Sequence, residues 1–138
     1  MKKILFLLFM SLSVYAVQAQ TCTPNLVVDD IDMTISGNQL IFEWDVPSSG
    51  GTGGPPPPPP GFVSYNIEIQ YGTATFGGIS WGSTKGRYGV TYLSSEPQTI
   101  TAYKASNPTY QYIRMRIQLI KDDGTCEHSW SSWYEFPI

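Results

Sequence analysis

Apolar and polar residues alternate along most of the chain with a period of two, which is typical of β-strands rather than helices. The alternation is clearest in YQYIRMRIQLIKDDG, residues 110–124, and it recurs in QLIFEWDVP, residues 39–47, and FVSYNIEIQYG, residues 62–72. Because successive side chains of a strand point to opposite faces, one face of each segment is predicted to be buried. In the first segment the buried residues would be Ile113, Met115, Ile117 and Leu119.

Weaker strand patterns occupy residues 25–36, where the phase changes midway, and residues 98–103 and 129–138. Beyond the first twenty residues, no window of eleven or more has the apolar spacing of a helix. About seven short strands between Gly, Pro and Asx turns predict an all-β, antiparallel two-sheet sandwich. The Gly-rich stretch 72–97 gives no clear strand assignment.

Residues 48–61, SSGGTGGPPPPPPG, interrupt the strand pattern with six consecutive prolines, Pro55 to Pro60. The two or three strands that precede this stretch are too few to bury a core. It is therefore predicted to be a loop inside one domain, residues 20–138, and not a linker. A polyproline loop is stiff. It is either a ligand for an aromatic groove, contacting through Pro55 to Pro60, or a rigid apical loop without a ligand.

The first 19 residues have the layout of a secretory signal peptide, with Lys2 and Lys3 followed by an apolar run and small residues up to Ala19. The apolar run is shorter than the ~20 residues that a membrane span needs. We therefore expect cleavage after Ala19 and a secreted protein, extracellular or at the cell surface.

Net charge and cysteine content narrow the partners and the compartment. The 138-residue chain has a net charge of −3, and loss of the leader leaves six basic residues against eleven acidic ones. An acidic surface disfavours nucleic acid as a partner. Cys22 and Cys126 are the only cysteines. Export predicts a disulfide between them, worth about 4 kcal/mol in the chain-entropy model, and two free buried thiols are the alternative.

The two ends of the predicted domain, CTPNLVVDDIDMTISGNQLIFEW at 22–44 and CEHSWSSWYEF at 126–136, resemble a fibronectin type III domain of secreted bacterial proteins. The resemblance covers essentially the whole mature chain. It implies an immunoglobulin-like sandwich, a non-catalytic binding or adhesion module, and a polyproline loop at the same end as residues 121–127. One departure is Gln111, which stands where the family has a tyrosine before the sixth strand.

The segment WSSWY, residues 130–134, resembles the Trp-Ser-x-Trp-Ser signature of cytokine-receptor fibronectin domains. The resemblance implies that Trp130 and Trp133 interleave with Arg114 and Arg116 in a structural ladder. Each exposed cation–π contact would contribute about 0.5–1 kcal/mol. The motif carries no information about a ligand.

The segment GTATFGGISWGSTKGRYGVTYLSS, residues 72–95, has the composition of adaptable recognition loops, with aromatic anchors among small polar residues. These aromatics are candidates for binding a protein or stacking on the sugar rings of a carbohydrate, or they simply cover the sheet. The candidates are Phe76, Trp81, Tyr88 and Tyr92.

No pattern of catalytic or metal-binding residues stands out. Asp29, Asp30 and Asp32 do not have the spacing of a calcium loop and are expected to form a charged strand edge. His128, the single histidine, has no zinc partners once the cysteines are paired, and no catalytic triad can be assembled around it. We expect no enzyme activity, no cofactor and no metal. The alternative to a binding module is a structural subunit that self-assembles through strand edges into a surface layer or fibre.

Overall fold

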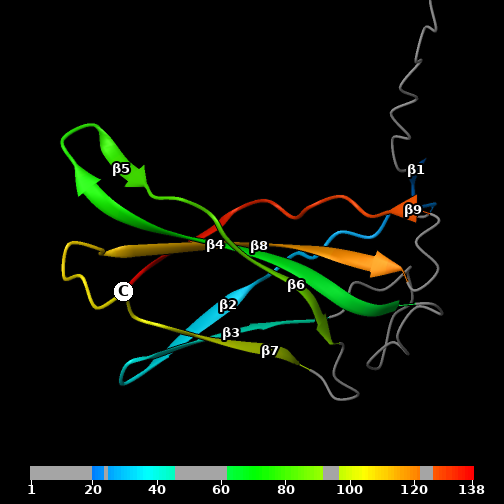
Figure 1. The fold of residues 1–138 in the computed structure, drawn as a ribbon, viewed down its shortest axis with the longest axis horizontal. Coiled ribbons are helices and arrows are strands. Elements are labelled where there is room, and N and C mark those ends of the chain that lie inside the picture. The colour runs from blue at the N-terminus through cyan, green and yellow to red at the C-terminus, as the bar shows by residue number, and fades with distance from the viewer. Residues whose placement is uncertain (1–19, 24, 46–61, 92–96, 122–125) are drawn as a thin grey trace, which may run out of the picture.

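The computed structural model describes residues 20–23, 25–45, 62–91, 97–121 and 126–138. In these residues the chain forms strands and no helix, so the predicted all-β fold is confirmed (Figure 1). The predicted leader, Pro55–Pro60 and Tyr92 lie outside the described residues. The strands are β1 (Gln20–Thr21), β2 (Asp32–Ser36), β3 (Gln39–Trp44), β4 (Phe62–Thr75), β5 (Gly78–Trp81), β6 (Lys85–Thr91), β7 (Gln98–Tyr103), β8 (Tyr112–Lys121), β9 (Cys126–Glu127) and β10 (Tyr134–Pro137).

The strands form two sheets that pack as a sandwich, as the sequence predicted. The larger sheet has the order β1-β9-β8-β4-β5, with β10 also pairing with β8 and β6 with β4. The smaller sheet has the order β2-β3-β7. All pairs are antiparallel except the short β1–β9 pair, which is parallel.

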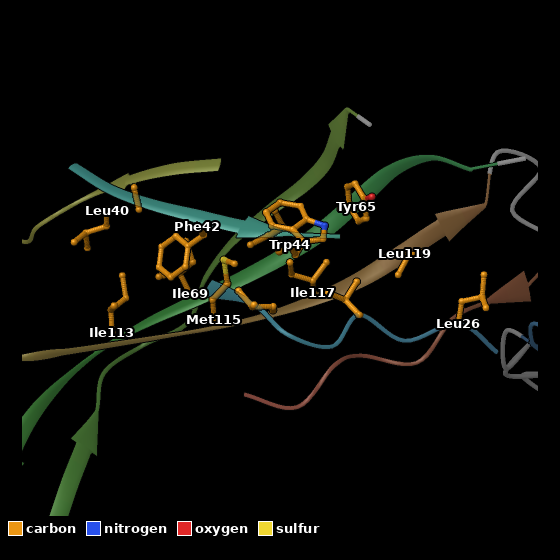
Figure 2. Close-up of a cluster of buried hydrophobic side chains, with 14 residues drawn as sticks. Leu26, Leu40, Phe42, Trp44, Tyr65, Ile69, Ile113, Met115, Ile117 and Leu119 are labelled. Carbon is orange, nitrogen blue, oxygen red and sulfur yellow. The ribbon is translucent and has the colours of Figure 1, made fainter. Parts of the chain in front are cut away.

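The core lies between the two sheets and is built mainly from inward-facing residues at every second position of β3, β4 and β8 (Figure 2). Trp44 of β3 and Tyr65 of β4 meet edge to face across it, with ring centroids 5.3 Å apart. Burial of each large apolar side chain contributes about 1.5–3 kcal/mol. The inward row of β8 is fully buried as predicted: Ile113, Met115, Ile117 and Leu119.

The change of phase in residues 25–36 is located at Asp30. Its φ of 55° places the backbone in the left-handed region, which Asp tolerates better than most residues. The Asp30 N–H donates to the Tyr134 hydroxyl at 3.0 Å. This kink lets both Val28 and Ile31 face the core. Ile35, near the end of edge strand β2, is exposed.

The N-terminal segment is fastened to the C-terminal segment at several points. Cys22 and Cys126 form the predicted disulfide, which joins residues 104 positions apart. The Cys22 N–H also donates to the Glu127 carbonyl at 3.0 Å. Nearby, the buried His128 accepts a bond from the Leu26 N–H through Nδ1 at 2.9 Å. The histidine is therefore part of the structural tie between the two segments.

Two strands, β5 and β6, occupy the stretch in which the pattern gave no assignment. Both pair with β4. Strand β5 pairs with the last four residues of β4, and β6 pairs with the first half of β4. Thr75 pairs with Gly78, so Phe76 and Gly77 form a two-residue hairpin turn. Gly78 has a φ of 133°, which side-chain-bearing residues rarely adopt. The register between β6 and β4 shifts between Tyr65 and Ile67.

Gln111, which directly precedes β8, joins three segments. Its N–H donates to the Gly72 carbonyl at 3.0 Å, and its carbonyl accepts from the Ile138 N–H at 2.9 Å. Its side-chain Oε1 accepts from the Ala74 N–H at 3.2 Å. The amide side chain therefore supports the far end of β4.

Candidate functional site

Five side chains form a continuous cation–π ladder on the outer face of the larger sheet. The guanidinium carbon of Arg114 lies 4.3 Å from the ring centre of Trp81 and 4.6 Å from that of Trp133. The guanidinium of Arg116 lies 4.7 Å from Trp133 and 4.7 Å from Trp130. The structure thus brings together the four residues of the expected ladder and adds Trp81, one of the aromatic residues that the sequence offers either as ligand contacts or as a cover of the sheet.

Carboxylate and amide groups hold the two arginines of the ladder in place. Arg116 forms an ion pair with Glu68 of β4 at 2.6 Å, and Arg114 forms one with Glu135 of β10 at 3.3 Å. Arg114 Nε also donates to Gln70 at 2.8 Å. Both guanidinium charges are therefore balanced by carboxylates. The ladder is suited to rigidity more than to capture of an anion.

Trp81 reaches the ladder because it crosses β4 at a glycine. Gly72 pairs with Trp81 in the β4–β5 hairpin. A Cβ at Gly72 would lie 2.8 Å from the Trp81 ring and 2.6 Å from Cγ2 of Ile79. A side chain at position 72 would therefore clash with the indole and with Ile79, and glycine leaves room for the ring beside Arg114. This role could not be predicted from the residue pattern, because the hairpin register is needed to place Trp81 opposite Gly72.

Phe76 occupies the tip of the β4–β5 hairpin and is fully exposed. The pairing of β4 with β8 ends at Gly72, so residues 73–80 project beyond β8 by three residue pairs (Figure 1). At ~3.4 Å per residue this is about 10 Å. The Thr75 hydroxyl donates to the Gly78 carbonyl at 2.9 Å, and Gln111 holds the base. The phenyl ring is thus carried on a tethered arm.

The end of the sandwich that carries Phe76 is nearly free of charge. It includes residues 35–40, 72–82 and 102–112, within which Lys104 is the single charged residue, and Arg114 packs on Trp81 at its border. Among the described residues, three of the four exposed large apolar or aromatic side chains lie at this end. They are Ile35, Phe76 and Tyr103. We call this region the hairpin end.

Carboxylates gather toward the opposite end, where β4 begins. Asp32 pairs with Glu43 across β2 and β3, close to the end of β3 at Trp44. Phe62 pairs with Lys121 there, so the flanks of the polyproline loop and of residues 122–125 lie at the same end. The molecule is therefore polarised, with an acidic end and a hairpin end that has few charged residues.

Among the remaining ligand candidates, Trp81 is the one whose side chain the structure describes, and it does not lie beside Phe76. Trp81 is half-buried on the ladder, five residues from the hairpin tip. Tyr88 belongs to β6, and its side chain is outside the described part of the structure. Pro55, Pro60 and Tyr92 also fall outside it.

The described ranges contain neither a cluster of metal ligands nor a membrane-spanning helix. Those ranges contain no group of three or more His, Cys, Asp or Glu side chains that could hold a metal ion. Nor do they contain a helix long and apolar enough to cross a membrane. The chain matches no protein-family model and no curated protein.

Proposed function

We propose that the protein is a secreted, non-catalytic binding module that recognises an extracellular protein or carbohydrate through its hairpin end. The observation that carries this proposal is Phe76, a fully exposed ring at the tip of a tethered hairpin. Aromatic anchors dominate the binding energy of many interfaces, and a rigid anchor loses little entropy on binding. Residues 72–84, which include Phe76, contain no charged residue, and this suits a partner surface that is apolar or rich in hydroxyl groups.

The resemblance to fibronectin type III domains is part of the same proposal. It is supported by the division into a three-stranded and a larger sheet, with Trp44 of β3 packed in the core against Tyr65. Export is supported by the signal-like leader and by the Cys22–Cys126 disulfide, since such bonds persist in oxidising compartments.

The proposal is tested by substituting Phe76 with serine in the mature protein and measuring binding to a glycan array and to extracellular proteins. Loss of a dominant anchor weakens binding by about 2 kcal/mol or more, roughly 30-fold. Val27→Ser, at an exposed apolar residue outside the hairpin end, is the matched control. Every interaction that the wild type makes should survive Val27→Ser and weaken with Phe76→Ser. If Phe76→Ser leaves the affinity of every interaction unchanged, the binding site does not lie at the hairpin end.

A further inference from the structure

The smaller sheet has two outer edges, β2 and β7, and they differ in charge. Edge strands expose unpaired backbone groups, and proteins commonly protect them with charged residues, prolines or bulges. Strand β2 begins with Asp32, which follows Asp29 and Asp30. Strand β7, QTITAY, contains no charged residue and no proline. In the described structure β3 is the one strand that pairs with it. Some other feature must protect this edge.

The backbone bonds at the end of β7 show which residues face outward. The Lys104 N–H donates to the Asn38 carbonyl at 3.0 Å, across the turn from β3. Bonded residue pairs alternate with non-bonded ones in an antiparallel ladder, so the Gln39–Tyr103 and Ile41–Thr101 pairs are non-bonded. Thr99, Thr101 and Tyr103 therefore direct their backbone N–H and C=O groups away from β3.

Two side chains of the larger sheet donate hydrogen bonds to outward-facing carbonyls of β7. The Tyr71 hydroxyl of β4 donates to the Tyr103 carbonyl at 2.6 Å, and Arg87 Nη1 of β6 donates to the Thr101 carbonyl at 3.1 Å. A neighbouring strand lies only about 4.8 Å away in a sheet. Tyr71 and Arg87 thus stand where the backbone of an added strand would have to lie. We call these two residues the edge guards.

Of the two edge guards, Tyr71 is held in place by more packing contacts than Arg87. The Tyr71 ring is packed against Tyr110 with centroids 5.7 Å apart, and Lys85 Nζ lies 5.4 Å from its centre. Arg87 is exposed and reaches its carbonyl with a long, flexible side chain. Displacement of Arg87 is therefore the easier step in uncovering the edge.

We propose that β7 is a guarded strand-pairing edge and that the strand it fits is the same β7 edge of a second copy of this chain. An antiparallel two-fold pair centred on Thr101 would set Thr101 opposite Thr101 and Thr99 opposite Tyr103. These pairs contain no like charges, and threonine and aromatic pairs of this kind stabilise sheets. This interface is centred on Thr101 and does not use Phe76, the residue that carries the ligand proposal.

The test removes both guards from the mature, disulfide-bonded protein, with Tyr71→Phe keeping the ring and Arg87→Ala removing the cation. Light scattering across a concentration series then gives the dimer dissociation constant. We expect that constant to fall at least tenfold relative to wild type, because the guard bonds no longer compete with strand pairing. Tyr134→Phe is the control, since it removes another hydroxyl that bonds backbone but contacts Asp30 and not an outward carbonyl of β7.

A second substitution shows whether any association uses β7. Thr101→Lys, added to the guard variant, would place two lysines opposite each other at the two-fold axis and should return the protein to monomer. Thr34→Lys is its match, because Thr34 lies in the same cross-strand row on the same face, at the β2 edge. That change should leave the dimer intact.

Several outcomes overturn the proposal. They are a guard variant that keeps the wild-type circular dichroism and stays monomeric, association that Thr101→Lys does not reverse, and association that Thr34→Lys reverses equally. If the double variant fails to fold, Arg87→Ala alone decides the matter. Arg87 is exposed, and Arg87→Ala should lower the dimer dissociation constant at least threefold. An unchanged constant would refute the proposal that Arg87 protects the β7 edge.

Discussion

The two faces of β8 are built from the same ten residues and are stabilised in different ways. The inner face presents Ile113, Met115 and Ile117, which are fully buried against the smaller sheet (Figure 2). The outer face presents Arg114 and Arg116, whose guanidinium groups stack between indole rings. The inner face depends on the apolar area removed from water, whereas the outer face depends on the distance and orientation of polar groups. A single alternating pattern therefore encodes two kinds of stability.

The largest expected effect comes from the inner face. Ile117→Ala should lower the free energy of unfolding by about 2–5 kcal/mol, because it removes buried area and leaves a cavity in a closely packed core. Ile117→Val, the matched control, should cost about 0.5–1.5 kcal/mol. Both follow from urea denaturation of the oxidised protein. A loss below about 1 kcal/mol for the alanine variant would mean that the core relaxes around the gap and that the two faces contribute alike.

The outer face should give a smaller effect. Trp133 touches both arginines, so Trp133→Leu removes two cation–π contacts while keeping an apolar side chain. At about 0.5–1 kcal/mol per contact the expected loss is about 1–2 kcal/mol, and Trp133→Phe should lose less because a ring face remains. Equal losses for Leu and Phe, measured by the same denaturation, would show that Trp133 contributes by its bulk and not by its π face.

The sequence predicted the inner face better than the outer one. Strict alternation in β8 identified Ile113 to Leu119 as core residues, because burial of one face requires that pattern. The disulfide followed from composition and compartment, since Cys22 and Cys126 had no other partners. Strands β5 and β6 could not be predicted, because their glycines and small polar residues show no alternation of apolar and polar positions.

The candidate site was only partly visible in the sequence. Composition singled out Phe76, but its exposure depends on the two-residue turn that follows from the pairing of Thr75 with Gly78. Trp81 was grouped with it, although the register sends its ring over Gly72 to Arg114. Cross-strand register is a long-range property, and a single sequence with few charges in this segment does not specify it.

The smallest effect concerns Tyr71, which ends the inward row of β4 and packs half-buried against the core. Burial raises the pKa of this tyrosine above its usual 10.0, and the nearby Arg87 partly opposes the shift. The other groups around the ring are Lys85 of β6 and Tyr110.

A raised folded-state pKa means that the folded protein holds the Tyr71 proton more tightly than the unfolded chain. The stability that the protonated hydroxyl contributes is therefore complete below about pH 10 and is lost as the pH rises through the higher folded value. The phenolate that forms has no proton to donate to the Tyr103 carbonyl, so the bond at 2.6 Å is lost with it. We expect the free energy of unfolding to fall more steeply for wild type than for Tyr71→Phe between about pH 9 and pH 11. All other groups are the same in the two proteins, so parallel curves would show that Tyr71 does not link this edge of the sandwich to pH.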